Sequence, residues 1–267
     1  MTVTPAELGR LLGREVSSVV PAGDGYDNQA YLVDGRTLVR VAKDTDAEAT
    51  RREAAVLRAV RAAVAVPVPE PEAVRPEEGL LAYPALPGRP LADLPLPPPP
   101  GVVPALARLL DDLHAMPLPA LRALGVPDDD TAPAEWREEA AETYERVSGE
   151  IPAAYRAAVA AFLVEPPPEP ARRLVFGHQD LGAEHVLVDP ESGTVTGVID
   201  WTDAAIGDPA VDAGRLHRDL GPSWGPVDGR ARFYARCAAL EDFEFGLRTG
   251  RERYVRNSLR AFGWLFS

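Results

Sequence analysis

The chain has 267 residues and carries 41 acidic side chains against 28 Lys and Arg, which gives a formal net charge of −13. This charge excludes nucleic acid as a partner, because phosphate binding needs a basic surface. It is compatible with a polycationic partner, which the negative field would attract. Cys237 is the single cysteine, so an intrachain disulfide and a cysteine-based zinc site are also excluded. The length fits one large domain or two lobes with a substantial core.

The sequence predicts a cytoplasmic protein that does not bind membranes. Its first residues, MTVTPAELGR, lack the basic and apolar regions of a secretory signal. No apolar run approaches the ~18 residues that a membrane span needs.

The first 84 residues are predicted to be rich in β-strands, with one long helix inserted. Thr4-Pro-Ala-Glu7 is a capping box that starts a short helix, and Gly13 ends it. Asp34-Gly35 is a strong signal for a tight hairpin turn. The other expected elements are a helix from about Asp46 to Ala62 and the strands Val16–Val20, Gln29–Val33, Thr37–Ala42 and Gly79–Tyr83.

Beyond the Pro-rich connector Leu94–Gly101, the pattern changes to helices. They are expected at Val103–His114, Pro133–Ser148 and Ala153–Leu163, and again from Pro209 to the end. We therefore predict an α+β fold with a small β-rich N-lobe, residues 1–84, and a larger helical C-lobe, residues 85–267. A ligand would lie between the lobes, where pockets are common.

The segment from Phe176 to Arg215 carries most of the functional information. Two hydrophobic runs and a turn between them predict a β-hairpin: HVLV at 185–188, VTGVI at 195–199 and the turn Pro190–Gly193. If the turn is centred on Ser192-Gly193, His185 lies opposite Asp200, and opposed residues have Cβ atoms about 4.5–5.5 Å apart. The turn type leaves this register open by one residue. With Asp180 on the preceding loop, the three side chains predict a divalent metal site.

Three motifs in this segment resemble the small-molecule branch of the protein-kinase-like fold, namely the aminoglycoside phosphotransferases and their macrolide- and peptide-antibiotic relatives. His178-Gln-Asp180-Leu is similar to the catalytic-loop HxD of that family. Gly197-Val-Ile-Asp200-Trp is similar to its metal-binding strand, and Gly207-Asp-Pro-Ala-Val-Asp212 to its GDPxxD segment. The resemblance covers most of the chain, is sharpest over residues 174–216, and implies a bilobal protein-kinase-like fold.

The resemblance implies roles for the residues of these motifs. Asp180 accepts or orients the proton of a substrate hydroxyl, while His185 and Asp200 hold Mg²⁺ on the nucleotide phosphates. The family commonly has Asn where this chain has His185, and Mg²⁺ prefers oxygen ligands, so the histidine would admit Mn²⁺ or act through water. His178 shapes the loop, and Asp212 hydrogen-bonds its backbone.

The resemblance also implies that the N-lobe binds ATP or GTP. Gly25 lies in the segment 22–28, which takes the place of the nucleotide-covering loop but lacks GxGxxG. Tyr83 belongs to the segment Leu81–Pro84, which corresponds to the hinge whose backbone binds the purine.

A strand cation should grip the phosphates and pair with a helix carboxylate, for which Glu53 is expected. Arg40 and Lys43 are the two candidates, and on a regular strand they face opposite sides because their spacing is odd. Arg40 is favoured, because it lies inside the apolar run while Lys43 lies at its end.

Acidic side chains of the C-lobe are candidates for binding the amines of a substrate. Family analogy favours Glu138, Asp242 and Glu244. Asp203 is open between a place beside the metal ligands, where it would also face substrate, and a helix cap.

We predict an antibiotic O-phosphotransferase that confers resistance by moving the γ-phosphoryl of ATP or GTP to a hydroxyl of a cationic antibiotic. Aminoglycosides rank first as acceptors, and tuberactinomycin-type peptides such as capreomycin and viomycin follow. The alternatives are a kinase of the same fold for a metabolite such as an amino alcohol or a sugar, a metal-dependent hydrolase, and a nucleotide-binding module without catalysis. The hydrolase would leave the Arg40–Glu53 pair and the GDPxxD segment unexplained.

Overall fold

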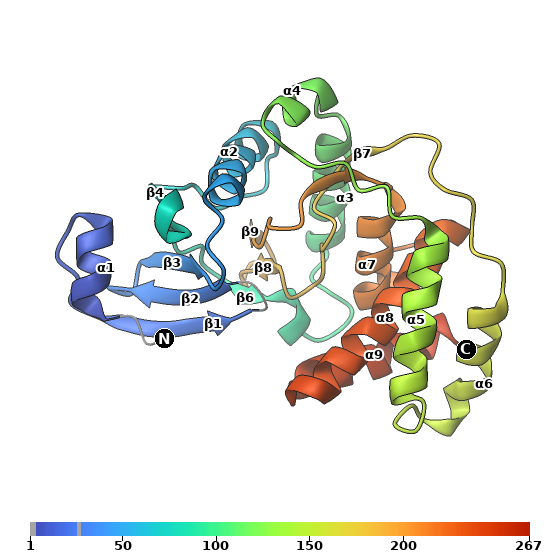
Figure 1. Ribbon diagram of the computed structural model, residues 1–267. Coiled ribbons are helices and arrows are strands. Elements are labelled where there is room, and N and C mark those ends of the chain that lie inside the picture. Colours follow the sequence, from blue (N-terminus) through green and yellow to red (C-terminus); the bar gives the residue numbers. More distant parts are fainter. Residues whose placement is uncertain (1–3, 26–27) are drawn as a thin grey trace.

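The computed structural model describes residues 4–25 and 28–267 (Figure 1). Figure 1 shows an N-terminal sheet on one side, a group of helices on the other, and the short strands β8 and β9 between them. The predicted α+β architecture is therefore confirmed. In the described part of the chain, no helix is both long and apolar enough to cross a membrane.

Five antiparallel strands form the N-terminal sheet, in the spatial order β1-β2-β3-β5-β4. Asp34 and Gly35 both have positive φ, 50° and 66°, and make the predicted tight turn between β2 and β3. The strands are β1 (Val19–Asp24), β2 (Asn28–Val33), β3 (Thr37–Ala42), β4 (Ala73–Arg75) and β5 (Leu80–Pro84). The first strand was expected at Val16–Val20, and the structure places it three residues later.

Two helices accompany this sheet. α1 (Pro5–Leu12) has the predicted capping box between Thr4 and Glu7, and its Leu8 is buried among apolar residues of β2, β3 and β5. α2 (Ala47–Ala63) begins after Asp46, whose carboxylate accepts hydrogen bonds from two backbone N–H groups of the first turn. Val56, Leu57 and Val60 of α2 belong to the large apolar core that also contains α3 and the hairpin. α2 therefore packs against both parts of the molecule.

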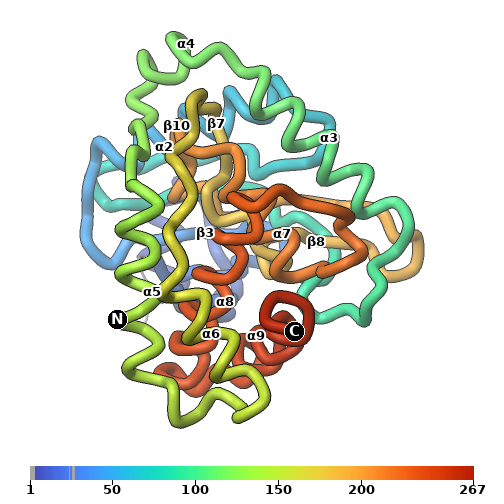
Figure 2. The backbone as a smooth tube through the Cα atoms, turned by 90° about the vertical axis from the view of Figure 1, so that its right-hand side faces the viewer, coloured from blue at the N-terminus to red at the C-terminus, as the bar shows by residue number. Residues whose placement is uncertain are grey.

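The rest of the chain is largely helical, and Figure 2 views it from the side of α5 and α6. α8 packs against α5, α7 and α9. The helices are α3 (Val102–His114), α4 (Leu118–Ala123), α5 (Pro133–Val147), α6 (Ala153–Val164), α7 (Ala210–Leu220), α8 (Gly229–Thr249) and α9 (Glu252–Leu265). Short 3-10 helices lie at η1 (Pro76–Glu78), η2 (Leu91–Asp93) and η3 (Gly221–Ser223).

Five short strands place the functional segment. β6 (Arg89–Pro90), β8 (Val186–Val188) and β9 (Val195–Val198) form one small sheet in the order β6-β8-β9. β7 (Val175–Gly177) pairs with β10 (Ala205–Gly207) in another.

The predicted register of the hairpin is wrong by one residue. Val186 faces Val198, and Ile199 donates its backbone N–H to the carbonyl of His185 at 2.9 Å, so His185 lies opposite Ile199 and not Asp200. The cause is the turn: it closes between Asp189 and Thr194, and the pairing shifts once more between Leu187 and Val188.

Candidate functional site

A cleft of about 720 Å³ lies between the N-terminal sheet and the helical part. β1, β2, β3 and β5 contribute one wall, and the segment that carries Asp180, the hairpin end, α7, α8 and α9 contribute the other. Nine of the residues that the sequence singles out line this cleft: Gly25, Arg40, Tyr83, Asp180, His185, Asp200, Asp203, Asp242 and Glu244.

The loop that carries Asp180 is held by the buried carboxylate of Asp212. One oxygen of Asp212 accepts a hydrogen bond from the His178 N–H at 2.8 Å, and the other accepts from the Leu181 N–H at 3.4 Å. Between them, Gln179 takes φ of 65°, which turns the chain sharply and aims Asp180 at the cleft.

His178 ties the same loop to the hairpin. Its Nε2 donates to the carbonyl of Ile199 at 2.9 Å, and because a carbonyl only accepts, Nδ1 is left to accept the Asp180 N–H at 3.3 Å. Burial lowers the pKa of His178, which keeps the ring neutral as these two bonds require. Its side chain does not line the cleft.

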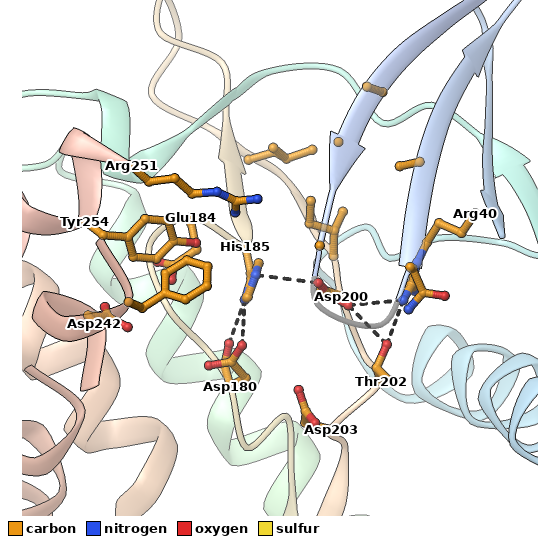
Figure 3. A pocket seen from close by; sticks show the side chains of 18 of the residues that line it. Arg40, Asp180, Glu184, His185, Asp200, Thr202, Asp203, Asp242, Arg251 and Tyr254 are labelled. Carbon is orange, nitrogen blue, oxygen red and sulfur yellow. Dashed lines mark hydrogen bonds and ion pairs between the residues drawn. The ribbon is translucent and has the colours of Figure 1, made fainter. Parts of the chain in front are cut away.

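His185 lies between the two carboxylates of the predicted metal site (Figure 3). Its Nδ1 donates to the backbone carbonyl of Asp180 at 2.8 Å, which directs Nε2 toward Asp200, whose Oδ2 is 3.7 Å away. Burial by itself lowers the pKa of His185, but the carboxylates of Glu184, Asp180 and Asp200 outweigh it and raise the pKa.

The donor set fits a divalent cation that takes two protein ligands. Nε2 of His185 and the carboxylate of Asp200 face the same space, and Asp200 is half-exposed. Among the described residues, no group of three or more His, Cys, Asp or Glu side chains is arranged to hold a metal. The remaining ligands would therefore be phosphate oxygens and water, as is usual for Mg²⁺ beside a nucleotide.

Of the two candidate cations, Arg40 on β3 and Lys43 just after it, Arg40 is the one that pairs with Glu53. Its other amino group donates to the Thr202 hydroxyl at 2.7 Å and lies 3.3 Å from Asp200. Burial by itself lowers the pKa of Arg40, but the neighbouring carboxylates, Glu53 foremost, outweigh burial and raise the pKa. The guanidinium is therefore charged.

Lys43 binds a different partner from those of Arg40, and Tyr83 of the hinge segment is buried. Lys43 donates to the carbonyl of Gly25 at 2.6 Å and lines a separate cavity of about 360 Å³, which it shares with Glu53. Tyr83 is buried in β5 beside Arg40, and burial raises its pKa to about 12. Residues 26 and 27 of the expected nucleotide-covering loop lie outside the described residues.

Two arginines of α7, which the sequence interpretation missed, support the catalytic loop. Arg215 lies 3.0 Å from one oxygen of Asp180, and it outweighs the effect of burial, so that the pKa of Asp180 is lowered. Arg218 is fully buried and pairs with Asp219, whose other contact is the Ala183 N–H at 2.6 Å. The available signal was the spacing from Asp212, which places Arg215 one turn further along the same helix.

The four candidate substrate acids do not share one environment. Asp242 pairs with the buried Arg218 at 2.9 Å, and Glu244 lies 3.6 Å from both Arg146 and Arg248. Asp203 lines the cleft near Asp200, and the helix-cap alternative is wrong because the next helix, α7, starts only at Ala210. Glu138 is exposed on α5 and does not line the cleft, because no part of α5 reaches it.

Aromatic side chains line the end of the cleft that lies away from Arg40. The rings of Phe245 and Tyr254 meet edge to face with centroids 4.9 Å apart, and the guanidinium of Arg251 lies over Phe245. Figure 3 shows Tyr254 and Arg251 on the opposite side of His185 from Arg40.

Solved structures of antibiotic kinases share this architecture. An APH(2″) aminoglycoside phosphotransferase in complex with GDP and kanamycin is 21% identical with a TM-score of 0.69, and the match covers 96% of this chain and 95% of the other. The macrolide 2′-phosphotransferase MphH from Brachybacterium faecium, an apoenzyme, is 25% identical with a TM-score of 0.60, covering 96% of each chain. A macrolide 2′-phosphotransferase of type I is 24% identical with a TM-score of 0.62, covering 98% of this chain and 99% of the other.

These likenesses confirm the predicted bilobal kinase-like fold. No curated protein sequence matches the chain. The phosphotransferase enzyme family matches it over residues 18–252, which is most of its length and includes all three motifs. The chain belongs to this family and is a phosphotransferase.

Proposed function

We propose that the protein transfers the γ-phosphoryl group of ATP or GTP to a hydroxyl of a cationic antibiotic and thereby confers resistance. The observation that carries the proposal is the common cleft: Asp180 faces it from one side, Arg40 from the other, and His185 and Asp200 lie between them. We place the activity in the cytoplasm, where nucleoside triphosphates are supplied, with an N-lobe of residues 1–84 and a C-lobe of residues 85–267.

Phosphoryl transfer needs positioning and charge neutralisation more than covalent chemistry from the protein. Asp180 has one oxygen on Arg215, which leaves Oδ2 to accept a hydrogen bond from the acceptor hydroxyl and then its proton. Arg40, fixed by Glu53 and Thr202, contacts the nucleotide phosphates. His185 and Asp200 would hold Mg²⁺ or Mn²⁺, which supplies positive charge to the phosphates when bound.

The nucleotide base fits the apolar part of the cleft next to the hinge. Small and aliphatic side chains line it there, namely Ala22, Ala30, Leu38, Ala85, Leu86 and Leu187. Neighbouring structures hold GDP or ADP in complexes, which supports a nucleotide as co-substrate. Gly25 lines the cleft, and its carbonyl accepts a hydrogen bond from Lys43, which supports a role for this segment in covering the phosphates.

The net charge of −13 favours a cationic acceptor, as does the acidic side of the cleft formed by Asp203, Glu241 and Glu244. Structural neighbours bind kanamycin, streptomycin or hygromycin B. We therefore rank aminoglycosides first and tuberactinomycin-type peptides second. A macrolide is a further candidate, because the rings of Phe245 and Tyr254 offer an apolar surface at the acceptor end.

Mass spectrometry of an antibiotic panel tests the proposal. The purified protein is incubated with Mg²⁺, ATP or GTP, and aminoglycosides, tuberactinomycins and macrolides. We expect one class to gain a single phosphoryl group, and Asp180→Asn to lower its kcat/KM by about 100-fold or more, since a positioned acid or base contributes 10²–10⁴-fold.

The matched control is Asp128→Asn, which removes a carboxylate from an exposed pair with Arg122 and should leave turnover unchanged. If no antibiotic is modified although nucleotide binds, the proposed acceptor class is refuted, and a metabolite kinase or a nucleotide-binding module without catalysis remains. If Asp180→Asn turns over within a few fold of the wild type, the role of Asp180 is refuted.

A further inference from the structure

One face of α7 holds the catalytic loop along its whole length. Asp212, Arg215 and Asp219 are spaced by three and four residues, so they lie on the same side of the helix. Asp212 accepts the N–H groups of His178 and Leu181, and Asp219 accepts that of Ala183. These two aspartates hold only the backbone of the loop, whereas the arginine between them also contacts a side chain.

That arginine, Arg215, is buried and makes three polar contacts. Its Nε donates to the carbonyl of Gln179 at 3.1 Å, and Nη1 lies 3.0 Å from Oδ1 of Asp180. Nη2 lies 3.7 Å from Glu241, whose side chain is exposed on α8. The guanidinium therefore holds both the backbone before Asp180 and the carboxylate of Asp180 itself.

We infer that Arg215 is a positioning residue for phosphoryl transfer, which acts by fixing the orientation of the Asp180 carboxylate. The inference rests on the proposed function. With Oδ1 held by Arg215, rotation about the last side-chain bond is blocked, and Oδ2 stays on the cleft side, 3.5 Å from Nδ1 of His185. This is the oxygen that the acceptor hydroxyl would meet.

The residue type matters because the two contacts diverge. A guanidinium presents several N–H groups in a rigid plane and can serve Gln179 and Asp180 at once. A lysine ammonium carries the same charge at a single point on a flexible chain, so it would keep the attraction but lose the fixed geometry. The charge matters too. Without Arg215, less positive charge would offset the carboxylates of Asp180, Glu184 and Asp200, which line the cleft and would repel an incoming triphosphate.

A double-mutant cycle with Asp180 separates positioning from simple structural support. Arg215→Met should lower kcat by roughly 100-fold, because a misplacement of about 1 Å can have this effect. The kcat of Arg215→Lys should lie between those of Arg215→Met and the wild type. In an Asp180→Asn background, Arg215→Met should lower kcat less than about threefold further, because residues that act as a unit are not additive. An equal loss in both backgrounds would overturn the inference.

Two controls complete the cycle. Arg108→Met makes the same substitution in an exposed arginine–aspartate pair on α3 and should leave kcat unchanged. Thermal unfolding identifies a variant that fails to fold, and in that case Arg215→Lys carries the cycle.

A crystal structure of Arg215→Met tests the geometry without turnover. It therefore tests the inference even if no antibiotic proves to be a substrate. We expect the Asp180 carboxylate to rotate away from its place while His178, Leu181 and Ala183 keep their bonds to α7. An unchanged Asp180 carboxylate would overturn the inference whatever the acceptor is.

Discussion

His185 shows how a second bond fixes which atom a histidine presents. Nδ1 donates to the carbonyl of Asp180, so only Nε2 can face the carboxylate of Asp200, which is 3.7 Å away. An asparagine, which the family commonly has here, would offer an oxygen instead. In the proposed metal site, the histidine would therefore present a nitrogen, which favours metals that accept nitrogen more readily than Mg²⁺ does.

Asp34 gives a pH dependence that can be worked out from its contacts. Its carboxylate pairs with Arg14 at 2.6 Å and accepts the N–H groups of Ser17 and Ser18, which lowers its pKa from 3.8 to about 2. A depressed pKa in the folded state stabilises the fold above the unfolded value of 3.8, and this contribution is lost as the pH falls toward 2. We expect Asp34→Asn to lower the urea midpoint at pH 6, and by about half as much at pH 3, where the carboxylate is still largely ionised in the folded state but part of its contribution is lost. A gap between variant and wild type that is the same at both pH values would contradict this assignment.

At the scale of elements, the contact between α7 and α8 depends on one glycine. A Cβ atom on Gly214 would lie 2.6 Å from the carbonyl oxygen of Ala231 and 3.1 Å from the backbone nitrogen of Ala235. Backbone atoms cannot give way as a flexible side chain can, so the two helices would have to separate. We predict that Gly214→Ala destabilises the protein by about 1–3 kcal/mol, the usual range for overpacking, as measured by urea unfolding.

Gly149→Ala is the matched control, since a Cβ atom there meets nothing within 4 Å. Its effect should stay within about 0.5 kcal/mol. If Gly214→Ala proves as mild as this control, α7 and α8 are not in the close contact described here. Because α7 also holds the catalytic loop, the same variant should lose activity together with stability.

Long periodic elements could be predicted from the sequence, and short ones could not. The helix that begins after Asp46 and the strand Thr37–Ala42 were predicted within a residue of their bounds, because caps and apolar spacing mark them. β4, β6 and α4 were missed, since they are three, two and six residues long and are held by their neighbours. The hairpin register was also missed, because the geometry of the turn at 189–194 decides it and the residue types do not.

The candidate site follows the same rule. Asp180, His185 and Asp200 could be identified because they lie in motifs close together in the sequence. Thr202 and Arg215 could not, because each is identified only by a contact with a residue distant along the chain. Thr202 contacts Arg40, and Arg215 contacts Asp180. Glu138 lies outside the cleft because α5 as a whole does not reach it, and the packing of helices decides which of them line the cleft.

For the whole molecule, the apolar cores do not follow the boundary between the lobes. Val56, Leu57 and Val60 of α2 share a core with Leu106 and Trp201 of the helical part. Removing either part would expose this surface, so neither is a separate folding unit. We predict a single cooperative thermal transition, with a calorimetric enthalpy equal to the van't Hoff enthalpy. Two resolved transitions in scanning calorimetry would show instead that the lobes unfold independently.

The connection between the N-terminal sheet and the hairpin is fastened at both ends. The Ala85 N–H binds the carbonyl of Arg36 on the sheet side, and the Thr196 hydroxyl binds the carbonyl of Pro87 on the hairpin side. Gly88, at φ of 113°, has no room for a Cβ atom beside Val188. Within this connection, the backbone bonds between Ala85 and Pro87 are the ones that lie between the two fastenings, so rocking of the two parts would bend the connection there. Ala85 and Leu86 line the cleft themselves. A molecule bound beside them would therefore be displaced little by such rocking, whereas the rim of the cleft near Phe245 would be displaced most.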